Sequence, residues 1–141
     1  MKRTDSRLEL ENAAGRRVVI AFFADPDISI TEKTSDKATR NIVAIEIKGG
    51  ADPSNIWNRL GEAEKSHQSA KQCGFVEYWT IYNVGSLDEK KVREKSPTTN
   101  RFYALPELAR YEGSEYEDFR DRIAGFNSAP TGRGPHRSFW R

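Results

Sequence analysis

Three polar side chains, Asp27, Glu46 and Lys48, stand at positions that suit metal-dependent hydrolysis of a phosphodiester bond. In an extended strand, side chains two residues apart share a face, so Glu46 and Lys48 project together with Cα atoms roughly 7 Å apart. Two neighbouring carboxylates repel each other unless a cation lies between them. Oxygen ligands suit Mg²⁺, with water and a substrate phosphate completing its shell, and Mn²⁺ can substitute. The three residues therefore predict a nuclease site.

Lys48 has two chemical roles open to it at such a site. To act as a general base near neutral pH, its pKa of about 10.4 would have to fall by about 3, which costs roughly 4 kcal/mol. As a charged amine it would instead hold the attacking water and stabilise the charge that develops on the phosphorane. The second role demands less, and we favour it.

Two strands joined by a polar connection are expected to bring these residues together. Residues 42–48 form a short β-branched run, which is typical of a strand buried on both faces. Residues 27–31 alternate polar and apolar side chains, which predicts a second strand with Asp27 opposite its apolar face. An antiparallel return between the two strands would place Asp27 beside Glu46.

The surrounding elements predict an α/β (α+β) fold with a mixed sheet flanked by helices. In order they are a helix at residues 6–15, three strands at 17–23, 27–31 and 42–48, a helix from Asp52 to Gly74, and a strand at 75–84. A strand–helix–strand unit makes a parallel pair, so the strand at 75–84 is expected inside the sheet. Beyond it, residues 102–105 read as an extra strand, and a capping box at 114–117 opens a helix that ends at Gly125.

Pro26-Asp27 followed by Glu46-Ile47-Lys48 resembles the signature of the PD-(D/E)xK nuclease superfamily, whose restriction-endonuclease-like core has the predicted order of helix, three strands, helix and strand. Residues 24–28, 46–50 and 54–67 are similar to the XcyI group of type II restriction endonucleases, and the similarity covers roughly residues 15–84.

This resemblance implies a Mg²⁺-dependent, site-specific endonuclease that cuts double-stranded DNA at the palindrome CCCGGG. It implies Asp27, Glu46 and Lys48 as catalytic residues, with Asp27 and Glu46 as metal ligands. A palindromic target calls for a homodimer with one active site per strand. The chain is shorter than members of the group and corresponds to their catalytic half. The recognition sequence is therefore not transferred, and a separate specificity domain stays open.

Length and composition predict one catalytic domain at residues 1–128, followed by a basic, aromatic-bearing tail at 129–141. The 141 residues are 36% hydrophobic and 31% charged, which fits a globular chain. No apolar run approaches the ~20 residues of a membrane span, and no signal peptide follows Met1. We therefore expect a cytoplasmic protein without a membrane partner. The single cysteine, Cys73, excludes an internal disulfide and is expected to pack at a helix end.

Several polar side chains could contact DNA, although the net charge of only +2 does not establish binding. Two groups are candidates: Asn55, Asn58 and Arg59 at the start of the long helix, and Lys90, Lys91 and Arg93 in the polar connection 85–101. A solvated helix face and a solvated loop are the alternative readings. The tail could stack on bases or dock on a partner. His67, on the apolar stripe of the long helix, is expected to be a hydrogen-bonded core residue rather than a ligand.

Three functions stay open at this point. The leading prediction is a restriction-type endonuclease. An enzyme of the same fold acting in DNA repair or recombination is the first competitor. A catalytically silent module that binds DNA or completes an assembly is the second.

Overall fold

The computed structural model describes residues 2–3, 6–22, 25–34, 38–49, 53–85 and 87–126, with the backbone alone for residues 2, 3 and 53. A seven-stranded sheet forms its centre, and its strands lie side by side in chain order. The strands are β1 (Lys2–Arg3), β2 (Arg7–Glu11), β3 (Arg17–Phe22), β4 (Ile28–Lys33), β5 (Thr39–Lys48), β6 (Glu77–Tyr82) and β7 (Arg101–Ala104). Strands β1 to β5 pair antiparallel, whereas β5, β6 and β7 pair parallel. The predicted mixed sheet, with β6 in its interior, is confirmed.

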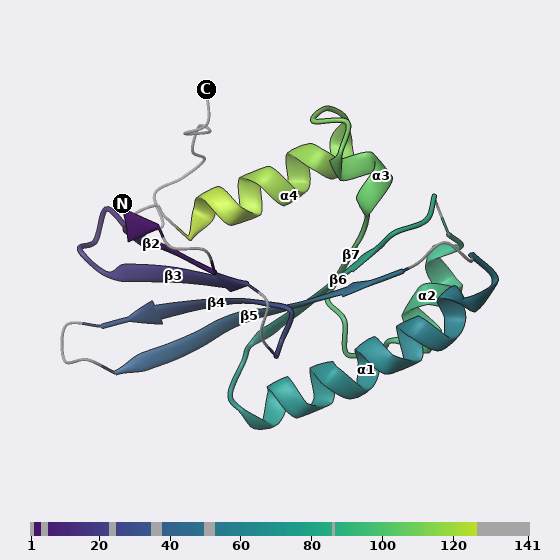
Figure 1. Ribbon diagram of the computed structural model, residues 1–141, viewed down its shortest axis with the longest axis horizontal. Helices are drawn as coiled ribbons and strands as arrows, with labels where there is room; N and C mark the ends of the chain where they lie inside the picture. The colour runs from purple at the N-terminus through teal and green to yellow at the C-terminus, as the bar shows by residue number, and fades with distance from the viewer. Residues whose placement is uncertain are drawn as a thin grey trace.

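Helices cover both faces of this sheet (Figure 1). The chain leaves β5 through a 3-10 turn, η1 (Pro53–Asn55), into α1 (Ile56–Gln72), and α2 (Glu89–Lys95) lies between β6 and β7. A short α3 (Leu105–Leu108) and the longer α4 (Ser114–Gly125) follow β7. In Figure 1, α4 lies over one face of the sheet, and α1 and α2 lie over the other.

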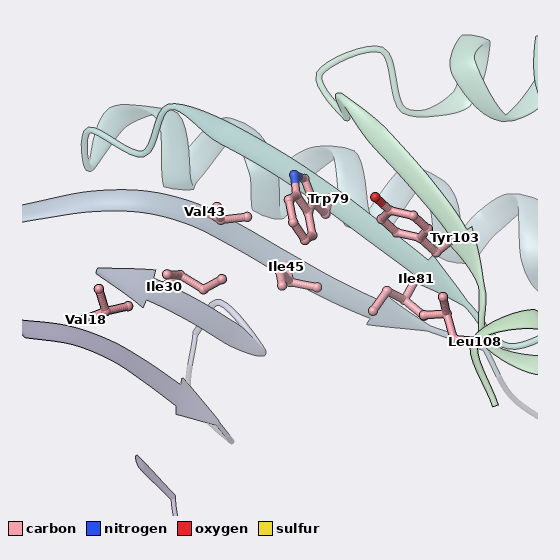
Figure 2. Packing of buried hydrophobic residues seen from close by; sticks show 8 residues of the cluster. All are labelled: Val18, Ile30, Val43, Ile45, Trp79, Ile81, Tyr103 and Leu108. Carbon is pink, nitrogen blue, oxygen red and sulfur yellow. The ribbon is translucent and has the colours of Figure 1, made fainter. Parts of the chain in front are cut away.

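The two faces of the central strands bury different side chains. On the α4 face, one cluster is apolar and rich in large residues (Figure 2). Its buried members are Val18, Ile30, Val43, Ile45, Trp79, Ile81, Tyr103 and Leu108. On the other face, Ala44 packs with Ala70 of α1, and Tyr82 packs with Ile56 and Leu60. Because side chains alternate along a strand, Glu46 and Lys48 share the α1 face with Ala44.

The predicted helix at residues 6–15 is wrong, because these residues form β2 and the turn that joins it to β3 in an antiparallel hairpin. Leu8 pairs with Ile20 and Leu10 with Val18. The apolar residues therefore alternate with a period of two, as in a strand and not as in a helix. The side chain of Asn12 accepts backbone hydrogen bonds from Ala14 and Arg16 and so closes the turn. The fold class stands, but its first element is a strand.

Smaller corrections concern the ends of three elements. The capping box at 114–117 is wrong, because Gly113 with φ 98° precedes α4 and no side chain caps it. The connection 85–101 is not only a loop, because Asp88 accepts a hydrogen bond from Lys90 N and begins α2. Cys73 is exposed and does not pack at the helix end. Asp52 and the tail at 129–141 lie outside the described residues.

Gly49, the first residue after β5, lies against the backbone of Asn83. A Cβ atom at position 49 would lie 2.5 Å from the Asn83 Cβ and 2.9 Å from its backbone nitrogen, at a φ of +157°. We expect Gly49→Ala to lower the free energy of unfolding by about 1–3 kcal/mol, because the backbone must shift. Urea denaturation followed by circular dichroism measures this loss.

Gly61→Ala is the matched control. Gly61 lies inside α1, and an added Cβ meets nothing within 4 Å. The same change there should raise stability by up to about 1 kcal/mol, because alanine is the better helix former. Equal effects of the two substitutions would contradict the steric argument.

Candidate active site

Strand β5 carries Glu46 and Lys48 on the face covered by α1. The Glu46 side chain is only 4% exposed and the Lys48 side chain 19%, and Lys48 Nζ lies 3.7 Å from Glu46 Oε1. Between them, Ile47 points to the other face and is 41% exposed. The predicted convergence of Glu46 and Lys48 on one face is confirmed.

Strand β4 brings Asp27 to the same place. Ile28 pairs with Ile45 across the antiparallel β4–β5 ladder, so Asp27, one residue earlier, lies beside Glu46, one residue later. The Asp27 carboxylate is held against β5, because its Oδ2 accepts a hydrogen bond of 2.8 Å from the backbone nitrogen of Ile47. One carboxylate is therefore anchored at the strand end and the other is buried beside it.

The surroundings of Glu46 disfavour the charged form of its carboxylate. Burial raises its pKa to about 7, and the neighbouring charge of Asp27 adds to the rise, while Lys48 opposes it. The charge of Asp25 also raises the pKa of Glu46. Asp25 is a contributor that strand periodicity could not find, because it precedes the strand.

The residues present fit a hard divalent cation. Two carboxylates side by side, one of them buried, favour a cation between them, and their oxygens are the ligands that Mg²⁺ and Mn²⁺ accept. Within the described ranges, no group of three or more His, Cys, Asp or Glu side chains is placed to hold an ion. Asp27, just before β4, and Glu46, on β5, are two carboxylates that lie side by side, and water and substrate oxygens suit the other positions of the shell.

The predicted DNA-contacting residues lie on neighbouring elements. At the start of α1, the Asn58 side chain donates to Asn55 Oδ1 at 2.9 Å, and Arg59 lies 3.6 Å from Glu62. On α2, Arg93 pairs with Glu89 at 3.0 Å. In Figure 1, α2 lies beside the beginning of α1, at the end of the sheet where β5 finishes.

One contact joins these two groups. Lys91 Nζ lies 5.7 Å from the centre of the Trp57 ring, a cation–π distance. An open cavity of about 280 Å³ adjoins this contact and is lined by Trp57, Lys91, Glu94 and Lys95. The start of α1 and the cations of α2 thus form one surface.

His67 is a buried, hydrogen-bonded residue, as its position on the apolar stripe predicted. It is fully buried, and its Nε2 lies 2.9 Å from the Thr80 hydroxyl. Burial lowers the pKa of His67 to about 4, although the charge of Glu64 opposes this. His67 is therefore neutral at pH 7.

The fold and the carboxylate pair define a restriction-endonuclease-like protein of mixed α+β class. The chain belongs to the XcyI restriction endonuclease family, because the family model matches residues 1–130. The type II restriction enzyme XcyI of Xanthomonas campestris pv. cyanopsidis is 52% identical over 126 residues, which cover 89% of this chain and 38% of the relative. The type II restriction enzyme Cfr9I of Citrobacter freundii is 51% identical over 130 residues, covering 90% and 39%.

The chain thus spans about two fifths of the length of the curated relatives it matches. A comparison with solved structures finds no match. Of the helices in the described residues, none combines the length and apolar character needed to cross a bilayer.

The low pKa of His67 makes a prediction about acid stability. A histidine whose pKa is about 4 when folded and about 6.5 when unfolded contributes stability above pH 6.5 that is lost as the pH falls toward 4. The loss amounts to about 3 kcal/mol. The raised pKa of Glu46 acts in the opposite direction over much of the same interval. We therefore expect urea denaturation in EDTA to show the His67 contribution as a difference between the wild type and a variant without the imidazole.

His67→Gln supplies the comparison, because glutamine does not titrate in this range. Relative to the wild type, its stability should rise as the pH falls from 6.5 to 4, because it lacks the unfavourable protonation of a buried imidazole. Parallel pH profiles for the two proteins would show that His67 makes no such contribution.

Proposed function

We propose that this chain carries the active site of a Mg²⁺-dependent, restriction-type endonuclease that hydrolyses double-stranded DNA. The observation that carries the proposal is the β4–β5 register, in which Asp27 lies beside the buried Glu46. Lys48, 3.7 Å from Glu46, is the third functional residue. Membership of the XcyI restriction endonuclease family supports the same conclusion. The relatives' names supply the restriction-type activity.

The roles of the three residues follow from their surroundings. Asp27 and Glu46 are the proposed ligands of Mg²⁺, for which Mn²⁺ can substitute, and the ion when bound polarises the phosphoryl oxygen and acidifies a water molecule. Lys48 lies beside Glu46, where its amine would orient the attacking water and stabilise charge on the phosphorane. Water attacks phosphorus in line, the bond to the 3′ oxygen breaks, and a 5′-phosphate and a 3′-hydroxyl remain.

The remaining parts of the proposal concern the whole enzyme. Residues 1–128 are the proposed catalytic domain, and the sequence that follows at 129–141 is basic and carries aromatic side chains. A homodimer would place one active site on each strand of a palindromic target. Because the chain spans two fifths of its relatives' length, a separate specificity domain fits the proposal. Its DNA substrate implies a cytoplasmic enzyme.

Asp27→Asn and Glu46→Gln test the metal-dependent chemistry. Each removes one carboxylate charge with little change of shape, so we expect nicking of supercoiled plasmid in Mg²⁺ to fall at least about 100-fold. Binding of a duplex oligonucleotide in EDTA should survive. Gel electrophoresis of the plasmid and fluorescence anisotropy of the duplex measure the two properties.

Asp121→Asn is the matched control, because Asp121 is an exposed carboxylate of α4 that pairs with Arg120 at 3.1 Å. It should nick at the wild-type rate. Full nicking activity in Asp27→Asn would exclude the assigned site, and binding without nicking in the wild type would favour the silent module.

The pattern of products separates restriction from repair. Sequencing of the ends from a digested phage genome should show cuts clustered at one short motif, and a duplex with CCCGGG is the first to try. Random ends would leave hydrolysis intact but count against the restriction reading.

The lysines of α2 make a separate prediction about DNA binding. Lys90, Lys91 and Arg93 are exposed, and each cation that contacts a phosphate releases a counterion. We expect Lys91→Ala to reduce the slope of log affinity against log salt concentration by about 1. Lys71→Ala, in the last turn of α1, is the control and should leave the slope unchanged. Equal slopes for all three proteins would remove α2 from the DNA surface.

A further inference from the structure

A chain of buried hydroxyl groups connects α1, β6 and the turn that follows α2. His67 Nε2 lies 2.9 Å from Thr80 Oγ1, which lies 2.8 Å from Thr99 Oγ1. Thr99 Oγ1 lies 2.7 Å from Ser96 Oγ, which donates to Glu64 Oε1 at 3.3 Å. His67 and Glu64 lie one turn apart on α1, so this series of hydrogen-bonded side chains begins and ends on the same helix. We refer to these five side chains as the hydroxyl ring.

The ring lies almost wholly in the interior. His67, Thr80 and Ser96 are 0% exposed and Thr99 is 4% exposed. A buried hydroxyl group must satisfy its hydrogen and its lone pairs inside the protein. The direction of each hydrogen bond in the ring is therefore determined by its neighbours.

Glu64 sets this direction. Burial raises the pKa of Glu64, but hydrogen bonds from Thr98, Gln68 and Ser96 outweigh it and leave the pKa below its usual range. Glu64 is thus an ionised carboxylate, which only accepts hydrogen bonds.

Each hydroxyl group has one hydrogen to give. Ser96 donates its hydrogen to Glu64, so Thr99 must donate to Ser96 and Thr80 must donate to Thr99. Thr80 can then only accept from His67 Nε2. The order of the ring therefore requires the His67 tautomer that carries its hydrogen on Nε2, with a lone pair on Nδ1, an atom without a hydrogen-bond partner among the described residues.

The opposite order has a physical cost. In the Nδ1–H tautomer, His67 Nε2 would carry the lone pair and would accept a hydrogen bond from the Thr80 hydroxyl group. Every hydroxyl group in the ring would then reverse. Ser96 would turn a lone pair toward the Glu64 carboxylate, which is repulsive.

Two members of the ring, Thr80 and Ser96, lie next to different parts of the proposed site. Thr80 of β6 pairs with Glu46 of β5 in the parallel ladder, so the ring passes beside the buried carboxylate. Ser96 ends α2, and its backbone nitrogen donates to the Val92 carbonyl at 3.0 Å. The ring thus connects the strand next to Glu46 with the end of the helix that bears Lys90, Lys91 and Arg93.

We propose that the hydroxyl ring positions α2 relative to Glu46, with His67 as its Nε2–H donor and Thr80 as the positioning residue. The ring holds the lysines of α2 at a fixed offset from the carboxylate pair, so that a DNA strand can contact both. This role rests on the proposed endonuclease function, whereas the tautomer and the anchoring of α2 do not.

Nitrogen-15 NMR of histidine-labelled full chain tests the ordering. The chain has two histidines, so His67→Gln assigns the His67 signals by their loss. We expect the Nε2–H tautomer in the wild type and in Thr80→Ser, which keeps the hydroxyl group. Detection of the Nδ1–H tautomer would overturn the ordering.

Amide hydrogen exchange tests the anchoring without DNA. Thr80→Val removes the hydroxyl group at nearly constant shape, and we expect exchange at residues 92–96 to accelerate at least tenfold, with little change at the α4 amides. Thr80→Ser should restore slow exchange. Gln68→Ala is the matched control, because it removes a hydrogen bond to Glu64 outside the ring. Unchanged exchange at residues 92–96 in Thr80→Val overturns the proposal.

A double-mutant cycle on duplex binding in EDTA tests the positioning of α2. We expect Thr80→Val to weaken binding several-fold and to reduce the effect of Lys91→Ala to less than half, because misplaced lysines no longer meet phosphates. Effects that multiply independently overturn the positioning role. Failure of the wild-type chain to bind any duplex also overturns the positioning role, because that role depends on the proposed function. The NMR and exchange results would still test the tautomer and the anchoring of α2.

Discussion

The antiparallel pairing of Ile28 with Ile45 is the constraint on which the site depends. This register sets Asp27 beside Glu46, and a slip by one residue would send one of the two carboxylates to the opposite face. The α4 face enforces it, because Ile30, Val43 and Ile45 pack there around Trp79. A dry apolar layer on one side of the sheet therefore fixes the polar arrangement on the other.

The α1 face accommodates buried polar groups in two different ways. Glu46 has carboxylate neighbours and a pKa raised to about 7 by burial, so it is left in an unfavourable state that a cation would relieve. Thr80 lies next to Glu46 and belongs to the hydroxyl ring, in which each hydroxyl group has hydrogen-bond partners. Hydrogen-bonded buried networks are rigid, so this neighbour would limit how far the Glu46 carboxylate moves away from the proposed ion.

The sequence revealed the central strands because their signals were local and strong. The β-branched run at 42–48 and the stripe of α1 each had one good interpretation, and both are confirmed. Residues 6–15 were wrongly predicted to form a helix, because Ser6-Arg7-Leu8-Glu9 fits a capping box. Pairing with β3 decided for a strand, and that partner is invisible to a local pattern. The hydroxyl ring was beyond prediction, because Thr80, Ser96 and Thr99 gain their meaning only when β6 and the turn meet α1.

Charge was a poor guide to the candidate DNA surface for a physical reason. Arg59 pairs with Glu62 and Arg93 with Glu89. The positive charge of each arginine is therefore partly neutralised by a glutamate of its own helix. Among the described residues, Lys90 and Lys91 make no ion pair, and Lys91 lies over the Trp57 ring. Exposed ion pairs are weak, so a phosphate could displace Glu89 from Arg93 at little cost. The charge available to DNA is therefore set by how firmly each cation is held, which the net charge of +2 does not express.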